Sequence, residues 1–280
     1  MSSEGAFPQG QSHQAEGPSA PTGPWSYADV TWPRPMSLPR AILLHASVHL
    51  RRVLTLRRLW PYLLLMALPI LASAGLARLA LDDTSVIGRF LQYFTLRAMA
   101  LCALGLGVSA IREDAEGGVL SLVLLRPRAT LAVPIGRCLA VTAVVGVLGT
   151  GMAVGSLATL LGTPFSPDIG YVARAVVAAW AGAFAYTGIF LGFGSWFAAG
   201  TAVGLGWLVG VDLVLAPYAE AAALVSPSHY LAILAQTLPG RDLVAANTAG
   251  QIPSAVAGLL LVGALGIGAS VWRLRGDPPN

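Results

Sequence analysis

Six long apolar segments constrain the fold of this chain more than any other feature of its sequence. A transmembrane helix needs roughly 20 mostly apolar residues, and these runs are too long for the core helices of a soluble domain. They lie at about 60–77, 90–111, 135–161, 175–197, 200–217 and 253–272. We therefore expect an all-α membrane protein whose six transmembrane helices occupy residues 60–274, followed by a cytoplasmic tail at 275–280.

The composition agrees with a chain that lies mostly out of water. Of its 280 residues, 55% are hydrophobic and 11% are charged, whereas soluble domains carry roughly 25% charged residues. Glycine, which is commoner in membrane helices than in soluble ones, occurs 32 times. The two cysteines, Cys102 and Cys138, form no CxxC pair. Neither a disulfide framework nor a zinc site is therefore predicted.

The arginines predict the orientation of the spans, because cytoplasmic loops are enriched in positive charge. With both termini in the cytoplasm, twelve of the 17 basic residues fall on the cytoplasmic side and one, Arg97, falls within a span. The four on the outer side are Arg78, Arg89, Arg174 and Arg241. We expect a multi-pass protein of the inner (plasma) membrane with both termini in the cytoplasm.

All 17 basic residues are arginine, and the absence of lysine excludes two kinds of chemistry. A phosphate-binding P-loop needs a lysine to reach the β- and γ-phosphates. A Schiff-base mechanism needs a lysine amine. The chain is therefore predicted to have no ATPase site of its own.

Other signals of enzyme chemistry are weak. His45 and His49 are spaced i, i+4, as two zinc ligands on one helix face would be, but no HExxH glutamate accompanies them. Residues 107–110 read GVSA and are similar to the serine motif of an intramembrane protease, yet the nearest candidate base, His229, lies in a different, extracytoplasmic segment. We predict no catalytic residue, no metal ligand and no cofactor bound by this chain.

Two segments precede the first span. Residues 1–37 are rich in Ser, Gly, Pro and Gln, so we expect a disordered cytoplasmic tail or, alternatively, a docking segment, and not a secretory signal. Residues 38–59 are predicted to form an amphipathic helix on the inner leaflet, or a simple positive-inside anchor. Its apolar face comprises Leu43, Ala46, Leu50, Val53 and Leu54, and its polar face comprises Arg51, Thr55 and Arg58.

Small residues four positions apart allow helix backbones to approach closely. Such pairs are Gly151/Gly155, Gly188/Gly192, Gly200/Gly204 and Gly206/Gly210. They predict close packing within this chain or against a second copy, and the spacing leaves open which of the two applies.

Two charges fall within the spans at a similar depth from the outer side, Arg97 and Asp212. A charge inside a bilayer is costly and usually finds a partner or water. We predict an Arg97–Asp212 pair or a shared polar cavity. The alternative is that both side chains reach the outer interface separately.

The polar insert at 112–128, REDAEGGVLSLVLLRPR, lies between the second and third spans and faces the cytoplasm in this orientation. Gly117 and Gly118 permit a sharp turn, and Pro127 disfavours helix at the residue before it. We expect a short helix parallel to the membrane, with acids at its start and arginines at its end, as the helix dipole favours. Its apolar centre would dock in a groove of another protein or lie on the inner leaflet.

Residues 111–137 resemble the cytoplasmic connection of ABC-transporter type-2 permeases. In that family an acidic pair precedes Gly-Thr, a leucine patch, a proline-containing turn and a Gly-Lys or Gly-Arg at the start of the third span. The corresponding residues are Glu113, Glu116, Gly117, Leu120, Leu124, Leu125, Pro127, Gly136 and Arg137. Gly118 stands where the family often has threonine, and the turn at 128–130 is a loose version. The layout over 38–274 is also similar, including an elbow helix and an outer segment at 218–252 similar to a re-entrant region.

The resemblance implies that residues 113–127 form the coupling helix, which docks on a nucleotide-binding ATPase subunit that uses ATP and Mg. The implied coupling residues are Glu113, Glu116, Gly117, Gly118, Leu120, Leu124, Leu125 and Pro127. It also implies a homodimer or heterodimer of permeases in the lipid membrane, export of an unspecified substrate, and no nucleic-acid partner. A membrane protein without transport activity, either an intramembrane hydrolase or a scaffold, is the alternative.

Overall fold

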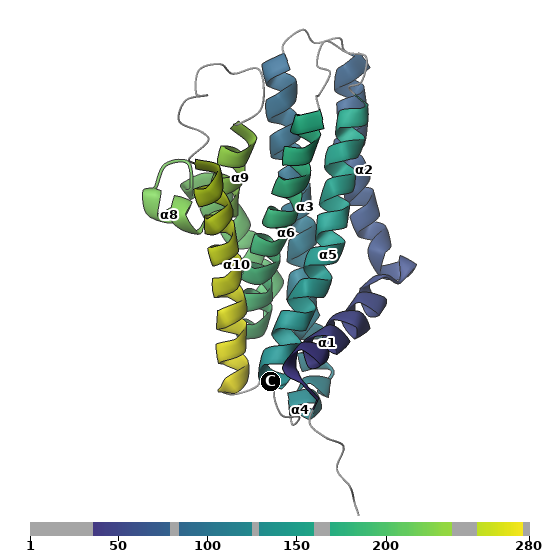
Figure 1. Cartoon of the computed structure of the whole chain (residues 1–280), viewed down its shortest axis with the longest axis vertical. Helices are drawn as coiled ribbons and strands as arrows, with labels where there is room; N and C mark the ends of the chain where they lie inside the picture. The colour runs from purple at the N-terminus through teal and green to yellow at the C-terminus, as the bar shows by residue number, and fades with distance from the viewer. Residues whose placement is uncertain (1–35, 79–83, 125–128, 160–168, 237–250, 277–280) are drawn as a thin grey trace, which may run out of the picture. The chain divides into compact units, whose positions relative to one another are not determined.

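The computed structural model describes residues 36–78, 84–124, 129–159, 169–236 and 251–276, and every element in these ranges is a helix (Figure 1). The predicted all-α fold is confirmed for this part of the chain. The elements are α1 (Leu38–Val53), α2 (Leu56–Arg78), α3 (Thr84–Glu116), α4 (Val119–Leu124), α5 (Ala129–Ala158), α6 (Ile169–Trp196), α7 (Gly200–Trp207), the π-helix η2 (Leu208–Leu215), α8 (Glu220–Val225), α9 (Pro227–Gln236) and α10 (Gln251–Arg275). The tail at 1–35, Leu125, Pro127 and most of the second half of the 218–252 segment lie outside the described residues.

Five of the described helices are long and apolar enough to cross a membrane. They are Leu56–Arg78, Phe94–Glu116, Ala129–Ala158, Val172–Trp196 and Ile252–Arg275. The predicted span at 200–217 is instead a shorter apolar helix, Gly200–Leu215, with eight α-helical residues followed by eight π-helical ones. At 1.5 Å per residue it is at most about 24 Å long, short of the roughly 30 Å hydrocarbon core.

Close approaches between helices fix their relative directions. Along α3, α6 and α10, residue numbers increase together at the contacts, so these three helices run in the same direction. The approaches that show this join Gly107 to Phe190, Gly194 to Val108, Gly188 to Gly263 and Gly192 to Gly266. Helix α5 runs opposite to α3, because Arg137 lies against Ala110 and Gly149 against Met99.

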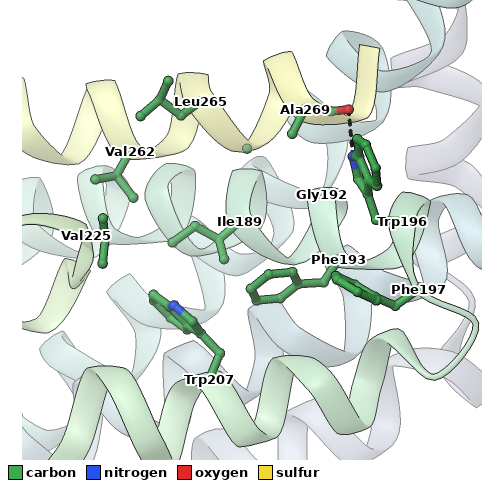
Figure 2. A pocket seen from close by; sticks show the side chains of 11 residues that line it. Ile189, Gly192, Phe193, Trp196, Phe197, Trp207, Val225, Val262, Leu265 and Ala269 are labelled. Carbon is green, nitrogen blue, oxygen red and sulfur yellow. Dashed lines mark hydrogen bonds between the residues drawn. The ribbon is translucent and has the colours of Figure 1, made fainter. Parts of the chain in front are cut away.

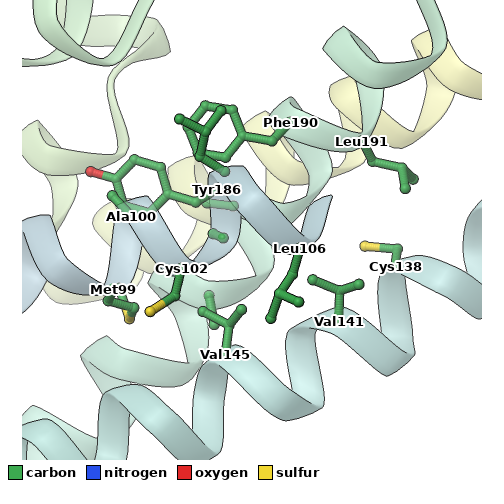
Figure 3. Packing of buried hydrophobic residues seen from close by; sticks show 14 of the residues in the cluster. Met99, Ala100, Cys102, Leu106, Cys138, Val141, Val145, Tyr186, Phe190 and Leu191 are labelled. Carbon is green, nitrogen blue, oxygen red and sulfur yellow. The ribbon is translucent and has the colours of Figure 1, made fainter. Parts of the chain in front are cut away.

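The buried core lies where α3 packs between α5 and α6 (Figure 3). Its largest side chains include Tyr186 and Phe190 of α6, whose rings stack with centroids 6.0 Å apart. Both cysteines are buried there as free thiols, Cys102 on α3 and Cys138 on α5. Helices α3, α5 and α6 therefore form the centre of the bundle.

The glycine pairs serve different interfaces, which their spacing alone did not distinguish. Gly188 and Gly192 let α6 meet the backbone of α10, since a Cβ on Gly188 would lie 2.3 Å from the Gly263 carbonyl oxygen. Gly151 and Gly155 meet Met66 and Ile70 of α2, and Gly204 meets Leu104 of α3. At Gly206 and Gly210 an added Cβ would meet no described atom within 4 Å.

Helix α1 packs against the start of α5. A Cβ on Gly136 would lie 2.6 Å from the Ile42 carbonyl oxygen, so the α1 backbone rests directly on α5. His49 and Val53 are buried, whereas Leu43 is 66% exposed and Leu54 is exposed as well. Leu43 and Leu54 were predicted on the apolar face of a helix that lies on the inner leaflet, and that prediction remains untested. The helix also ends at Val53, earlier than the predicted 59.

Candidate functional site

Two clusters of charged and polar residues are built around α3, one near each end of its apolar part. The Asp114 cluster consists of Arg52, Asp114 and Arg137, which come from α1, α3 and α5. The Asp212 cluster consists of Arg97, Tyr186, Asp212, Ser226 and Ser228. Arg97 and Asp114 are both on α3, 17 positions apart, which corresponds to about 25 Å along the helix.

In the Asp114 cluster, one buried carboxylate accepts hydrogen bonds from two guanidinium groups. Arg52 Nη1 donates to Asp114 Oδ1 at 2.6 Å, and Arg137 Nη2 donates to Asp114 Oδ2. Arg137 Nη1 also donates to the carbonyl oxygen of Ala110, one turn earlier on α3. Arg137 is buried within an apolar helix, so this carboxylate supplies the opposite charge that it needs. The cluster ties three helices together at one point.

The other two acids of the insert make weaker pairs at the surface. Glu113 accepts a hydrogen bond from Arg58 at 2.6 Å, and both side chains are exposed. Glu116 pairs with Arg112 at 2.7 Å, one turn away on the same helix, and its side chain is 61% exposed. Exposed pairs of this kind contribute about 0–1 kcal/mol. Glu113 and Glu116 therefore remain accessible, whereas Asp114 is committed to the fold.

The sequence predicted that the acids lie at the start of the short helix. In the structure they lie at the C-terminal end of α3. Helix α3 continues to Glu116, and Gly118 then adopts a φ of +66°, which forms the sharp turn that the glycine pair predicted. Carboxylates at a helix C-terminus are disfavoured by the helix dipole. The arginine partners of all three acids offset this effect, which the dipole argument from sequence did not consider.

The short helix α4 follows the turn and exposes less apolar surface than predicted. Leu120 is 1% exposed and belongs to the core of this chain, and Val123 and Leu124 pack against that core. Val119 is 44% exposed at the first position of the helix. The prediction of Leu120 as a docking residue was wrong for this reason: one face of α4 is needed to hold it against α3 and α5. The outward edge consists of Glu116, Gly117, Gly118 and Val119.

A polar pocket of about 440 Å³ lies beside this edge. Arg112, Glu113 and Glu116 of α3 line one side, and residues 198–202, which join α6 to α7, line the other. Ser109 also lines it, and its hydroxyl donates to the carbonyl oxygen of Leu106 at 3.2 Å. The pocket therefore brings the exposed acids next to the connection between two helices of the bundle.

The Asp212 cluster contains the Arg97–Asp212 pair that the sequence predicted. Arg97 Nη1 donates to Asp212 Oδ2 at 2.5 Å, and the Asp212 side chain is 0% exposed. Tyr186 donates to the same oxygen at 2.9 Å. The Ser226 hydroxyl and the Ser228 backbone N–H donate to Oδ1. Four donors thus satisfy the buried carboxylate, and the pairing is confirmed as a structural feature.

The π-helical turn explains how Asp212 reaches these partners. In η2 the backbone bonds widen to i→i+5, and such segments occur frequently at functional sites. Asp212 lies within η2, while Ser226 and Ser228 lie at the end of α8 and the start of α9. The cluster therefore links the irregular segment between α6 and α10 to the regular helices α3 and α6.

His49 is buried between α1 and α5, close to the Asp114 cluster. Its Nε2 atom makes no hydrogen bond within the described part of the chain. Burial, together with the positive charges of Arg137 and Arg52, lowers its pKa to about 4, and Asp114 opposes this shift. The ring is therefore neutral at pH 7 and serves as a packing residue of the α1–α5 contact.

Sequence reasoning missed Asp114, Arg52 and Arg137 as a cluster and Tyr186 as a partner of Asp212. One signal was available: Arg137 lies inside an apolar helix and requires an opposite charge, and the insert supplies three candidate acids. Which of the three reaches it depends on how α3 and α5 are rotated about their axes, and spacing alone does not give that rotation.

Comparison with known protein families gave no match to this sequence. Comparison with curated proteins gave no match either. The five long apolar helices and the two clusters around α3 define the chain as a multi-pass helical membrane protein.

The first prediction concerns the Asp114 cluster. Asp114→Asn removes the charge that offsets Arg137, and leaving a buried charge unpaired costs about 3–5 kcal/mol. We expect a large decrease in the thermal unfolding temperature of the purified protein in detergent. Glu113→Gln is the matched control, because it removes an exposed pair worth about 1 kcal/mol or less. Equal decreases for the two variants would contradict the structural role of Asp114.

The second prediction concerns the Asp212 cluster. Asp212→Asn leaves Arg97 without its carboxylate partner and is expected to destabilise the protein by about 3–5 kcal/mol. Arg97→Gln combined with Asp212→Asn should be more stable than Asp212→Asn alone, since no unpaired charge is left. Thermal unfolding of the single and double variants measures this coupling. Strictly additive effects would show that the two side chains do not interact.

The third prediction concerns pH. Because the pKa of His49 is about 4 in the folded chain and about 6.5 in the unfolded chain, its contribution to stability is complete above pH 6.5 and is lost as the pH falls towards 4. At pH 5 the loss is about 2 kcal/mol. The variant His49→Leu should show a smaller decrease in unfolding temperature between pH 7 and pH 5 than the unmodified protein. The same pH dependence in both would exclude a buried neutral His49.

Proposed function

We propose that this chain is the membrane-spanning permease subunit of a type-2 ABC transporter, which couples ATP hydrolysis on a separate subunit to substrate movement across the membrane. The observation that carries the proposal is the segment at 111–137, whose residues resemble the coupling region of that family. Three further features of the chain support it: the course of the helices, the missing lysine and the position of the Asp114 cluster.

The course of the helices supports an even number of crossings. Helices α6 and α10 run in the same direction, so the chain between Trp196 and Gln251 has to return from one end of the bundle to the other. We propose that α7, η2, α8 and α9 make this return, as a broken sixth crossing. Irregular backbone is tolerated at membrane depth where protein buries it, and the bonds from Ser226 and Ser228 to Asp212 meet this requirement.

The missing lysine supports dependence on a partner subunit. A permease that lacks a P-loop requires another protein to bind ATP and Mg, and the proposed partner is a nucleotide-binding ATPase. Its docking surface on this chain is the outward edge of α4, which we define as Glu116, Gly117, Gly118 and Val119. With the arginine-rich side inside, this edge lies in the cytoplasm.

The Asp114 cluster gives the proposed docking edge a rigid connection to the spans. Movement of α4 by the ATPase would be passed to α3 through the turn at Gly118, and to α5 and α1 through Arg137 and Arg52. Because α3 is continuous from Asp114 to Arg97, the same movement would reach the Asp212 cluster about 25 Å away. Buried charge pairs are either made or broken, so they suit a switch between two discrete arrangements.

The remaining parts of the proposal follow from the family resemblance. The protein would reside in the inner (plasma) membrane, pair with a second permease as a homodimer or heterodimer, and act in export. Arg97 and Asp212 are the intramembrane polar residues closest to a proposed substrate path.

The fourth prediction tests the docking edge. Val119→Asp places a charge on the exposed edge of α4 without disturbing the core. We expect it to reduce co-purification with the proposed nucleotide-binding subunit and to reduce ATPase activity of the complex. Leu54→Asp is the matched control, because Leu54 is similarly exposed in the turn between α1 and α2. Unchanged assembly and unchanged hydrolysis in Val119→Asp would refute the coupling assignment.

A further inference from the structure

An apolar groove of about 400 Å³ lies between α10, α6 and the α7–η2 helix (Figure 2). Ile189 and Phe193 of α6 form its floor, Trp207 rises from one side, and Val262 and Leu265 of α10 line the other. Trp196 and Phe197 lie at one end of it. The Trp196 indole N–H donates to the carbonyl oxygen of Ala269 at 2.9 Å, which fixes the ring at this end.

An arginine lies directly beyond the same end. The Arg273 guanidinium carbon is 5.9 Å from the centroid of the Trp196 ring, within the range of a cation–π contact. Within the part of the chain that the structure describes, no carboxylate pairs with Arg273. Arg273 is in the last turn of α10, one turn beyond Ala269. An apolar groove therefore leads to a cation without an acidic partner.

We propose that this groove binds one acyl chain of an anionic phospholipid from the cytoplasmic leaflet, with the lipid phosphate at Arg273. Arg273 lies at the end of α10 that faces the cytoplasm in the orientation set by the arginines, and the cytoplasmic leaflet carries the anionic lipids. The inference requires this orientation but no ATPase partner, so it stands independently of the proposed transport function.

The lining selects a hydrocarbon chain as the occupant. The side chains that line the groove are aliphatic or aromatic, and their polar atoms are the indole N–H groups of Trp196 and Trp207. The Trp196 N–H is already bonded to Ala269. From Val262 to Ala269 the groove follows about 10 Å of α10, which suits the headgroup-proximal part of an acyl chain.

The glycines argue against a helix from another subunit as the occupant. Close helix packing in membranes relies on exposed small residues. Gly192 and Gly266 line the groove, but they are already used against each other in the α6–α10 contact. A flexible acyl chain needs no exposed small residues.

The fifth prediction tests the apolar part of the site. The purified protein is placed in phosphatidylcholine nanodiscs that contain phosphatidylglycerol with a photoactivatable acyl chain. Crosslinks are expected on peptides that contain Phe193, Trp207 or Leu265. Leu265→Trp fills the groove and should reduce this crosslinking severalfold. Leu261→Trp is the matched control, because Leu261 is equally exposed on α10 but lies outside the groove.

The headgroup is tested by a pair of charge-matched variants. Arg273→Gln should reduce crosslinking by phosphatidylglycerol about fivefold, the effect of one interfacial arginine next to anionic lipid, and should leave crosslinking by a phosphatidylcholine probe unchanged. Arg275→Gln, in the same turn, should leave both unchanged. Equal crosslinking in Leu265→Trp and the unmodified protein would overturn the proposal. So would equal loss in Arg273→Gln and Arg275→Gln, or a loss of dimers in Leu265→Trp with no loss of lipid crosslinking.

Discussion

The contact on which the rest of this structure depends is the Asp114 carboxylate held between Arg52 and Arg137. It joins α1, α3 and α5 at one point, and it neutralises an arginine buried in an otherwise apolar helix. The strength of the contact comes from burial, since removing Asp114 would leave the buried Arg137 without solvent or counter-charge. This contact fixes the C-terminal end of α3. The turn at Gly118 and helix α4 come directly after that end in the chain.

Helix α3 gives the two clusters a common rigid element. It packs between α5 and α6 and carries Asp114 near one end and Arg97 in its apolar part. In the proposed transporter, a movement applied at α4 therefore need not pass through many independent contacts to reach Asp212. The π-helix and the break between α8 and α9 are the irregular parts, and they are bonded to the Asp212 carboxylate. In the proposed transporter, the regular helices would transmit a movement, and the irregular segment would respond to it.

Some features followed from local sequence properties and others did not. The apolar lengths predicted the helical fold, and the cost of a membrane charge predicted the Arg97–Asp212 pair. The glycine pair predicted the turn, because positive φ is available mainly to glycine. The same kind of reasoning failed for Leu120, which is buried. This error concerns which face of helix α4 meets its neighbours.

The sequence by itself determined that the chain forms apolar helices and that no P-loop is present. It also determined where charges must be compensated. Length, hydropathy and residue type decide these features because they act locally. Only the tertiary structure decided that Asp114, and not Glu113 or Glu116, meets Arg137, and that three of the glycine pairs pack within the chain. It also decided that Trp196, Trp207 and Val262, distant in sequence, border one groove. These outcomes depend on the rotation and depth of each helix against the others, which are set by packing of all the helices at once.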